Sequence, residues 1–222
     1  MNNPFKPEPT PENMKELKEY YNSRFLERPI REKDRFYSWI IKISRVNQNA
    51  SVLDVGCGLG LLLRETENLS QNLFGVDISE VAIKKAVANG INAQFVVAEG
   101  ENLPFPSGYF DFVFNLGSLE HFLKPETSLS EMARILKTDG TCVIMLPNSF
   151  YSGHIWRVVR TGLGPTHHQA LERFATLNEW RILIESNGFV VEKVKKYNKF
   201  KLWKTLLPFN LAYAFIYFCR KK

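Results

Sequence analysis

Hydrophobic residues recur at helical spacing near the start of the chain, after a polar, proline-rich tail. Two segments are expected to form helices, Glu12–Phe25 and Arg31–Ser44. In the second segment Phe36, Ile40 and Ile43 fall on one face, which is the spacing of an amphipathic helix. We therefore expect residues 1–45 to form a disordered tail and two helices that cap the main domain.

From residue 46 onward, short apolar runs alternate with segments of helical periodicity. The expected strands are Ser51–Val55, Asn72–Val76, Gln94–Ala98, Phe110–Asn115, Thr141–Leu146, Phe189–Val194 and Ala212–Cys219. The expected helices are Leu59–Leu69, Ser79–Asn89 with Ser79 as N-cap, Glu126–Leu136 ended by Asp139-Gly140, and Thr176–Asn187 closed by Gly188. This alternation predicts an α/β domain over residues 46–222, with a mostly parallel sheet covered by helices on both faces.

Residues 147–170 interrupt the alternation. The stretch is rich in glycine and contains three histidines, His154, His167 and His168. Ligands of open α/β sheets bind at the strand ends, so we expect this insertion to lie on the substrate side. Because histidine titrates near neutral pH, His154 and His167 are candidates for a general base.

The positive charge of the chain is concentrated near its end. The 222 residues carry a formal net charge of +6, from 29 basic and 23 acidic residues. Nine basic residues and no acidic one lie from Lys193 to Lys222, which leaves 20 basic against 23 acidic residues elsewhere. Apolar residues there alternate with lysines at helical spacing: Phe200, Trp203 and Leu207 with Lys199, Lys201 and Lys204. The pattern indicates either a peripheral membrane contact or an ordinary connection between the last two strands.

Cysteine content and hydropathy indicate a reducing compartment. Cys57, Cys142 and Cys219 lie far apart and give neither a disulfide framework nor the spacing of metal ligands. The polar N-terminus has no apolar signal region, and no apolar run reaches the roughly 18 residues of a membrane-spanning helix. The expected location is cytoplasmic, with peripheral membrane contact as an addition.

The most informative stretch is V-L-D-V-G-C-G-L-G, from Val52 to Gly60. A buried strand enters a turn in which Gly56, Gly58 and Gly60 allow unusual backbone angles and close approach of a ligand. A dinucleotide fold would have the spacing G-x-G-x-x-G, whereas the spacing here is G-x-G-x-G. Asp54 would repel a phosphate and attract an ammonium group. S-adenosylmethionine, which has an ammonium, a sulfonium and no phosphate, fits these features better than a dinucleotide.

Further acidic positions follow in order along the chain. Asp77 ends the second expected strand, where a carboxylate can accept hydrogen bonds from both hydroxyls of a ribose. Three stretches come after it: Glu99-Gly100-Glu101-Asn102-Leu103-Pro104-Phe105, Tyr109-Phe110-Asp111-Phe112-Val113-Phe114-Asn115, and Leu119-Glu120-His121.

With these motifs the chain resembles class I S-adenosylmethionine-dependent methyltransferases, in the small-molecule branch that includes quinone-biosynthesis C- and O-methyltransferases. The resemblance implies a Rossmann-like sheet of seven strands with the last one antiparallel, and S-adenosylmethionine as cofactor. It places Ile78 against the adenine, Glu99 near the adenine amino group, and Asn115 and Leu116 beneath the methionine end. The expected cofactor-binding residues are Asp54, Gly56, Cys57, Gly58, Gly60, Asp77, Ile78, Glu99, Gly100, Glu101, Asn115 and Leu116.

His121 raises the question of a metal. Some members of that family hold a divalent ion with Glu-x-x-Glu-His, but Gly117 stands at the first glutamate position here. Since hard cations need several oxygen ligands, we expect no metal and a structural or substrate-facing His121. Glu120 is expected to begin a helix. The candidate catalytic residues are therefore His154, His167 and His121.

The motifs also limit the substrate. No cysteine is placed to act as a nucleophile, which argues against methylation at cytosine C5. Asn115-Leu116-Gly117-Ser118 lacks the Asn/Asp-Pro-Pro-aromatic motif of enzymes that methylate amines in nucleic acids. The sequence thus predicts methyl transfer to a small, lipophilic molecule and not to nucleic acid. Two alternatives stay open, a non-catalytic subunit that binds S-adenosylmethionine and an NAD-binding oxidoreductase.

Overall fold

The structure is a computed structural model that describes residues 11–27, 34–163, 169–198 and 209–222. Seven strands are present: β1 (Val52–Val55), β2 (Leu73–Asp77), β3 (Gln94–Val97), β4 (Phe110–Leu116), β5 (Leu136–Pro147), β6 (Phe189–Tyr197) and β7 (Ala214–Lys221). The described helices are α1 (Met14–Glu27), α2 (Asp34–Ser44), α3 (Leu61–Thr66), α4 (Glu80–Ala88), α5 (Pro125–Ile135), α6 (Ser152–Thr161) and α7 (Leu177–Ser186), with 3-10 turns η1 (Leu119–His121) and η3 (Phe209–Leu211). The helix expected around Phe200, Trp203 and Leu207 lies outside the described residues.

The strands form one sheet in the order β3-β2-β1-β4-β5-β7-β6. Only β7 runs antiparallel to its neighbours, which confirms the predicted Rossmann-like fold. The chain builds outward from β1 to β3, then returns to place β4 on the other side of β1. This reversal of direction leaves a crevice beyond the carboxyl ends of β1 and β4, where α/β sheets of this type bind ligands.

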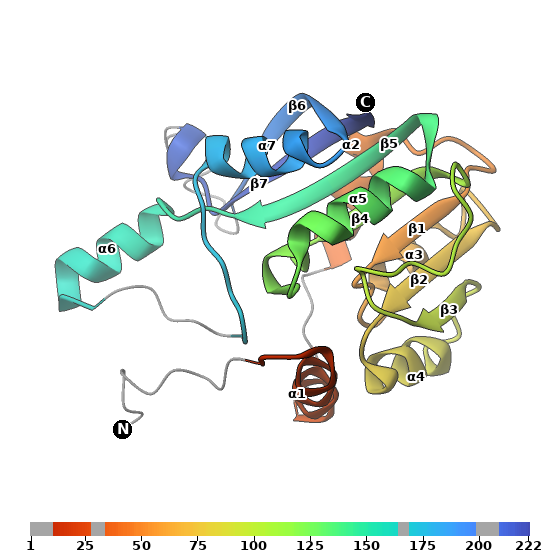
Figure 1. Ribbon diagram of the computed structural model, residues 1–222, viewed down its shortest axis with the longest axis horizontal. Coiled ribbons are helices and arrows are strands. Elements are labelled where there is room, and N and C mark those ends of the chain that lie inside the picture. Colours follow the sequence, from red (N-terminus) through yellow and green to blue (C-terminus); the bar gives the residue numbers. More distant parts are fainter. Residues whose placement is uncertain (1–10, 28–33, 164–168, 199–208) are drawn as a thin grey trace.

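Two hydrophobic cores flank the sheet. On one face α5 and α7 pack against the strands through Leu129, Met132, Trp180 and Ile184, all of them buried. On the other face α2 and α3 supply a second group of buried side chains: Phe36, Ile40, Ile41, Leu62 and Leu63. Figure 1 shows this layered arrangement, with α1 beside α4 and α6 extending away from the sheet.

Several helix starts follow the predicted capping rules. The Ser79 hydroxyl accepts a hydrogen bond from the Ala82 amide at 3.1 Å, which confirms Ser79 as the N-cap of α4. At α7 the Thr176 side chain accepts from the Glu179 amide, and Glu179 accepts in return from the Thr176 amide at 2.7 Å. This reciprocal capping box fixes the direction of the chain after the insertion.

One local prediction is wrong, and one element was not predicted. Helix α5 ends at Ile135, and β5 begins at once with Leu136, which pairs with Phe110. Asp139-Gly140 therefore lies inside the strand, in an irregular stretch before Thr141 pairs with Phe112, and does not terminate the helix. The insertion after Pro147, for which the sequence predicted no particular element, contains α6.

Candidate functional site

A cavity of about 770 Å³ opens at the carboxyl ends of β1, β2, β4 and β5. Its wall on the sheet side is formed by the glycine turn after β1 and by the end of β2. Helix α1 forms part of the opposite wall, and η1, the start of α6 and the loop before α7 complete it. The cavity therefore occupies the crevice that the strand order predicts.

The glycine turn is held tightly against its neighbours. Gly56 and Gly58 have φ values of +76° and +50°, which glycine adopts without a steric penalty. The amides of Gly56 and Cys57 both donate to the Val76 carbonyl, at 2.7 and 2.9 Å. A Cβ added to Gly56 would lie 2.4 Å from Oγ of Ser118 and 2.6 Å from its Cβ, so no larger residue fits there.

Asp77 is buried beside this turn. One carboxylate oxygen accepts from the Gly58 amide and the other from the Ser79 amide, both at 2.9 Å. Burial raises the pKa of Asp77 to about 6, and the two amide hydrogen bonds oppose that rise. Each carboxylate oxygen has a second lone pair, so Asp77 can still accept hydrogen bonds from a ligand in the cavity.

The structure brings most of the predicted cofactor residues to the cavity. Those that line it are Gly56, Cys57, Gly58, Asp77, Ile78, Gly100, Glu101 and Leu116. Those outside its lining are Asp54, Gly60, Glu99 and Asn115. Burial, and next the charge of Asp77, raises the pKa of Asp54 to about 8, whereas Glu99 is exposed. For these four residues, contact with a cofactor stays a prediction.

Asn115 has a structural role that the sequence did not reveal. Its side-chain amide donates to the Val55 carbonyl at 3.1 Å, and its side-chain oxygen accepts from the Leu119 amide at 2.9 Å. The fully buried side chain thereby links the end of β1 to η1. It sets the distance between the glycine turn and the opposite wall of the cavity.

Helix α1 forms part of the cavity wall. Leu17, Tyr21, Arg24 and Phe25 line the cavity from this helix. Polar contacts dock α1 on the start of α4: Lys18 with Glu80 at 2.6 Å, the Ser79 hydroxyl with Asn22 at 2.8 Å, and Lys85 with the Phe25 carbonyl at 2.6 Å. The cavity is thus bounded by two segments far apart in the sequence, the N-terminal helix and the sheet edge.

Two buried polar groups in the cavity wall lack partners among the described residues. They are the hydroxyl of Tyr21 and the Oε2 atom of Glu120. Burial raises the pKa of Glu120 to about 8, and the charge of Glu172 adds to the rise. Burial also raises the pKa of Tyr21, with the charge of Glu120 second. Since buried polar groups are nearly always hydrogen-bonded, these two atoms point to a polar ligand in the cavity.

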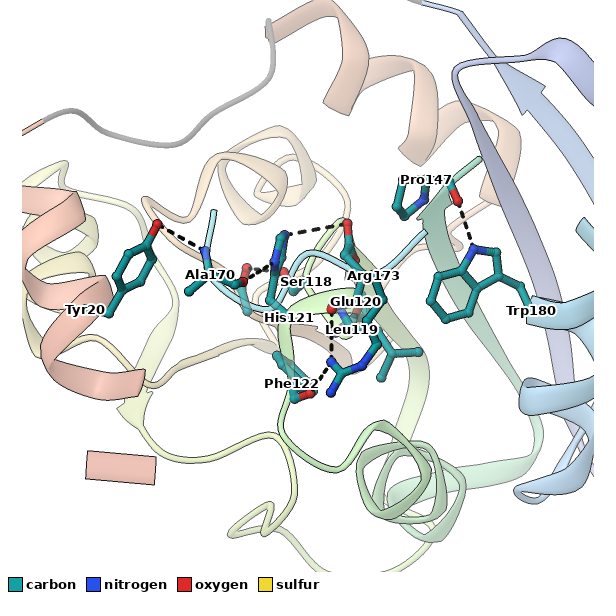
Figure 2. A network of polar contacts seen from close by, with 12 residues as sticks. Tyr20, Ser118, Leu119, Glu120, His121, Phe122, Pro147, Ala170, Arg173 and Trp180 are labelled. Carbon is teal, nitrogen blue, oxygen red and sulfur yellow. Dashed lines mark hydrogen bonds and ion pairs between the residues drawn. The ribbon is translucent and has the colours of Figure 1, made fainter. Parts of the chain in front are cut away.

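His121 is fixed by the polar network shown in Figure 2. Its Nδ1 atom lies 3.0 Å from the Ala170 carbonyl, and its Nε2 atom lies 3.8 Å from Oε1 of Glu120. Burial lowers the pKa of His121 to about 4, so the ring is neutral at neutral pH. A neutral ring that donates from Nδ1 to the carbonyl keeps a lone pair on Nε2, on the side of Glu120.

Arg173 fixes η1 and the residues after it through hydrogen bonds to their backbone carbonyls. Its guanidinium donates to the carbonyls of Glu120 at 3.1 Å, Phe122 at 2.6 Å and Leu123 at 3.4 Å. The Ala170 amide donates to the Tyr20 hydroxyl at 3.1 Å, which ties the same loop to α1. Glu120, the expected helix-start residue, lies in the 3-10 turn η1 and also lines the cavity. Neither Arg173 nor its contacts, some fifty residues along the chain, were indicated by the sequence.

The remaining wall is aromatic. His154 lines the cavity and packs edge-to-face against Tyr151 and Phe174, with ring centroids 5.2 Å apart in each case. Besides Tyr21 and Phe25 of α1, the lining also includes the rings of Tyr37, Phe122 and Tyr213. His121 and His154 therefore share one cavity, while His167 and His168 lie outside the described residues.

The charge of the cavity favours a cation. Four carboxylates line it, namely Asp77, Glu101, Glu120 and Glu172, against the single guanidinium of Arg24. Desolvation without cationic partners raises the pKa of Asp77 and Glu120, and a positively charged ligand would offset that cost. Within the described ranges no three His, Cys, Asp or Glu side chains are placed to hold a metal ion. The donor set and the glycine turn therefore fit S-adenosylmethionine.

Comparison with known families identifies the central part of the chain. Residues 53–144 match the family model described as "Methyltransferase domain". The uncharacterized methyltransferase YcgJ of Bacillus subtilis is 27% identical over 167 residues, which are 72% of this chain and 64% of that protein. A ubiquinone biosynthesis O-methyltransferase of Parvibaculum lavamentivorans is 27% identical over 64% of this chain and 59% of its own length. The chain thus matches somewhat less than two thirds of the length of these relatives.

A solved structure shares the fold along nearly the whole chain. Magnesium protoporphyrin IX methyltransferase from Synechocystis, determined with bound S-adenosylhomocysteine, superposes with a TM-score of 0.70. The match covers 95% of this chain and 100% of that one, at 15% identity. At this identity the likeness concerns the fold alone.

Proposed function

The chain carries a class I methyltransferase domain whose cofactor is S-adenosylmethionine, and we propose that it methylates a small, lipophilic molecule bound in the same cavity. When bound, the cofactor supplies a methyl group made electrophilic by its positively charged sulfur. One observation supports the proposal above all: a single cavity joins the glycine turn and Asp77 to a wall of aromatic side chains.

The sheet side of the cavity would hold the cofactor. Gly56 and Gly58 let a ligand approach the backbone of the turn, and Asp77 is oriented by two amides to accept hydrogen bonds from a ribose. Ile78 and Gly100 lie beside it in the lining. A Cβ on Gly100 would come within 2.4 Å of the Phe122 ring, so this position also needs glycine.

The aromatic side would hold the acceptor. A cavity of about 770 Å³ lies within the usual range of about 300–1,000 Å³ for small-molecule sites. Its rings favour an apolar or ring-bearing acceptor, and the free polar atoms of Tyr21 and Glu120 can fix a hydroxyl or an amine on it. The names of two relatives, a ubiquinone biosynthesis O-methyltransferase and a magnesium protoporphyrin IX methyltransferase, agree with an acceptor of this kind.

Glu120 is placed to receive the proton that the acceptor loses. Its pKa near 8 keeps the carboxyl close to the point of ionisation at neutral pH, and a nearby positive charge would favour the carboxylate. The guanidinium of Arg173 holds the backbone of Glu120, and the neutral ring of His121, fixed by Ala170, lies beside its carboxyl group. Orientation of the two reactants accounts for the larger share of the rate, about 7–11 kcal/mol in favourable cases.

The proposal can be tested without knowing the acceptor. The protein is incubated with S-adenosylmethionine carrying a labelled methyl group and with lipid-soluble and water-soluble metabolite fractions, and products are identified by mass spectrometry. We expect a labelled product in the lipid-soluble fraction, and at least about tenfold less of it with Asp77→Asn at a cofactor concentration below the dissociation constant of the wild type. Cofactor binding without turnover in any fraction would indicate a non-catalytic subunit, and would contradict the proposal.

A further inference from the structure

Helix α6 turns its apolar side toward solvent. Of the twelve exposed large hydrophobic side chains in the described part of the protein, six lie between Phe150 and Leu163. Within α6, Trp156 is 66% exposed and Val159 is 72% exposed, and the helix has no buried residue. Scattered exposed apolar residues are common, but a contiguous group on one element marks an interaction site.

These side chains form one strip along the helix. Ile155, Trp156 and Val159 share one face of α6, and Leu163 follows just beyond Gly162, which ends the helix in a left-handed conformation. The opposite face carries His154, which lines the cavity. A helix on the surface of a globular protein normally buries its apolar stripe, so α6 has the reverse orientation. Figure 1 shows that α6 extends from the end of β5 away from the body.

The charge around the strip is positive. Arg157 and Arg160 belong to α6, and the chain has no acidic residue from Pro147 to Leu171. Because Pro147 pairs with Ala214, and Ala214 with Tyr197, the strand end that bears Lys195 and Lys196 lies at the same end of the sheet. An apolar strip beside basic residues is the composition of helices that lie in the headgroup region of anionic bilayers.

We propose that α6 docks the protein on an anionic lipid bilayer, with Ile155, Trp156, Val159 and Leu163 inserted at the headgroup boundary. A second copy of the chain is a poorer occupant than an anionic surface, since its own strip carries the same basic residues and the segment has no acidic residue to pair with them. The strip also projects outward and offers no groove to a peptide. Tyr151 and Gly153, at the start of α6, line the cavity, so docking places the cavity close to the lipid.

Vesicle sedimentation tests this inference. The full-length protein is mixed with vesicles of equal parts phosphatidylcholine and phosphatidylglycerol, or of phosphatidylcholine alone, in the absence of cofactor and acceptor. We expect binding to the anionic vesicles that weakens as salt is raised. The double variant Trp156→Asp/Val159→Asp should bind at least about tenfold more weakly, because it places charges on the inserted face.

Matched controls keep the test specific. Ile182→Asp and Val87→Asp remove equally exposed apolar residues from α7 and α4, and both should bind vesicles like the wild type. Arg160→Glu should weaken binding several-fold at low salt only. Circular dichroism and S-adenosylmethionine affinity should be unchanged in every variant, which would show that the fold and the cofactor site are intact. A failure of membrane docking can then be distinguished from a failure of the proposed methyl transfer.

Three results would overturn the inference. The first is a wild-type protein that does not bind anionic vesicles. The second is binding that persists in the α6 double variant but disappears when Lys199, Lys201 and Lys204 are changed to glutamate, which would move the contact to the C-terminal segment. The third is a dimer in sedimentation velocity that the α6 double variant dissociates, without vesicle binding, which would make the strip a protein interface.

Discussion

The two sides of the cavity are built in different ways. The cofactor side consists of backbone at the ends of adjacent strands, with glycines whose positive φ values and close neighbours leave no alternative residue. The acceptor side consists of side chains from several segments far apart in the sequence, joined by hydrogen bonds such as those of Tyr20 and Arg173. A site made of backbone tolerates little variation, whereas a site made of side chains can change its ligand by substitution. The difference predicts large, general effects on one side and acceptor-specific effects on the other.

Glu120→Gln is expected to have the largest effect on turnover. If Glu120 receives a proton, its loss should lower turnover about 10²–10⁴-fold while cofactor affinity changes little. Because the carboxylate is the active form, kcat/KM of the wild type should rise with pH and level off above about 8, the pKa to which burial raises Glu120. The variant should lack this rise. A full pH profile that is retained in Glu120→Gln would assign the proton to another group.

Gly56→Ala comes next and should affect the whole protein. The left-handed backbone should lower the free energy of unfolding of the alanine variant by about 1–2 kcal/mol. The overlap with Ser118 should lower it by about 1–3 kcal/mol more. Gly90→Ala is the matched control, since Gly90 has a similar φ of +69° but nothing within 4 Å of an added Cβ. Denaturant unfolding measures both. Equal losses in the two variants would show that the contact with Ser118 does not matter, and Ser118→Gly should rescue Gly56→Ala in part.

Asp77→Asn is expected to weaken S-adenosylmethionine binding. The loss of a charge-assisted hydrogen bond should cost about 1.5–3 kcal/mol, which corresponds to roughly 10–150-fold in affinity. Glu99→Gln is the variant to compare with Asp77→Asn. Glu99 was predicted to lie near the adenine amino group, but it is exposed and outside the cavity lining. Calorimetry on both separates the two positions. Unchanged affinity in Asp77→Asn would contradict the assignment of the ribose to this carboxylate.

The smallest effect is expected from a matched pair of tyrosines on α1. Tyr20→Phe removes the hydrogen bond with the Ala170 amide and should lower the free energy of unfolding by about 0.5–1.5 kcal/mol. Tyr21→Phe removes a buried hydroxyl without a partner among the described residues, so stability should stay the same or rise. Tyr21→Phe should instead raise KM for the acceptor. A larger loss of stability in Tyr21→Phe than in Tyr20→Phe would contradict the described contacts.

The cofactor side could be predicted from the sequence because its signals are local. The turn after β1 is encoded by glycines within five positions, and Ser79 and Asp77 act on backbone amides close by in the fold. The same local reasoning failed at the α5–β5 junction. There Leu136 pairs with Phe110 across the sheet, and this long-range pairing overrode the turn tendency of Asp139-Gly140.

The acceptor side could be predicted only in outline. Glu120 is buried because Arg173 and Ala170 close over η1 from fifty residues away, and no local pattern reports such a contact. The helical spacing of Ile155 and Val159 was present in the sequence, but the glycines and histidines nearby led only to the prediction of an insertion. The apolar face of α6 also points away from the core, whereas the hydrophobic pattern of a surface helix predicts that this face packs against the core. The role of His167 as a general base and the contact of Lys199, Lys201 and Lys204 with a membrane stay predictions, since these residues lie outside the described ranges.

Direct binding of the cofactor tests the central claim most simply. Isothermal titration of the wild-type protein with S-adenosylmethionine, S-adenosylhomocysteine and NADH compares the two cofactor classes in one experiment. The acidic cavity and the glycine spacing predict saturable binding of both adenosyl compounds, competition between them at one site, and no binding of NADH. Binding of NADH in place of the adenosyl compounds would contradict the account.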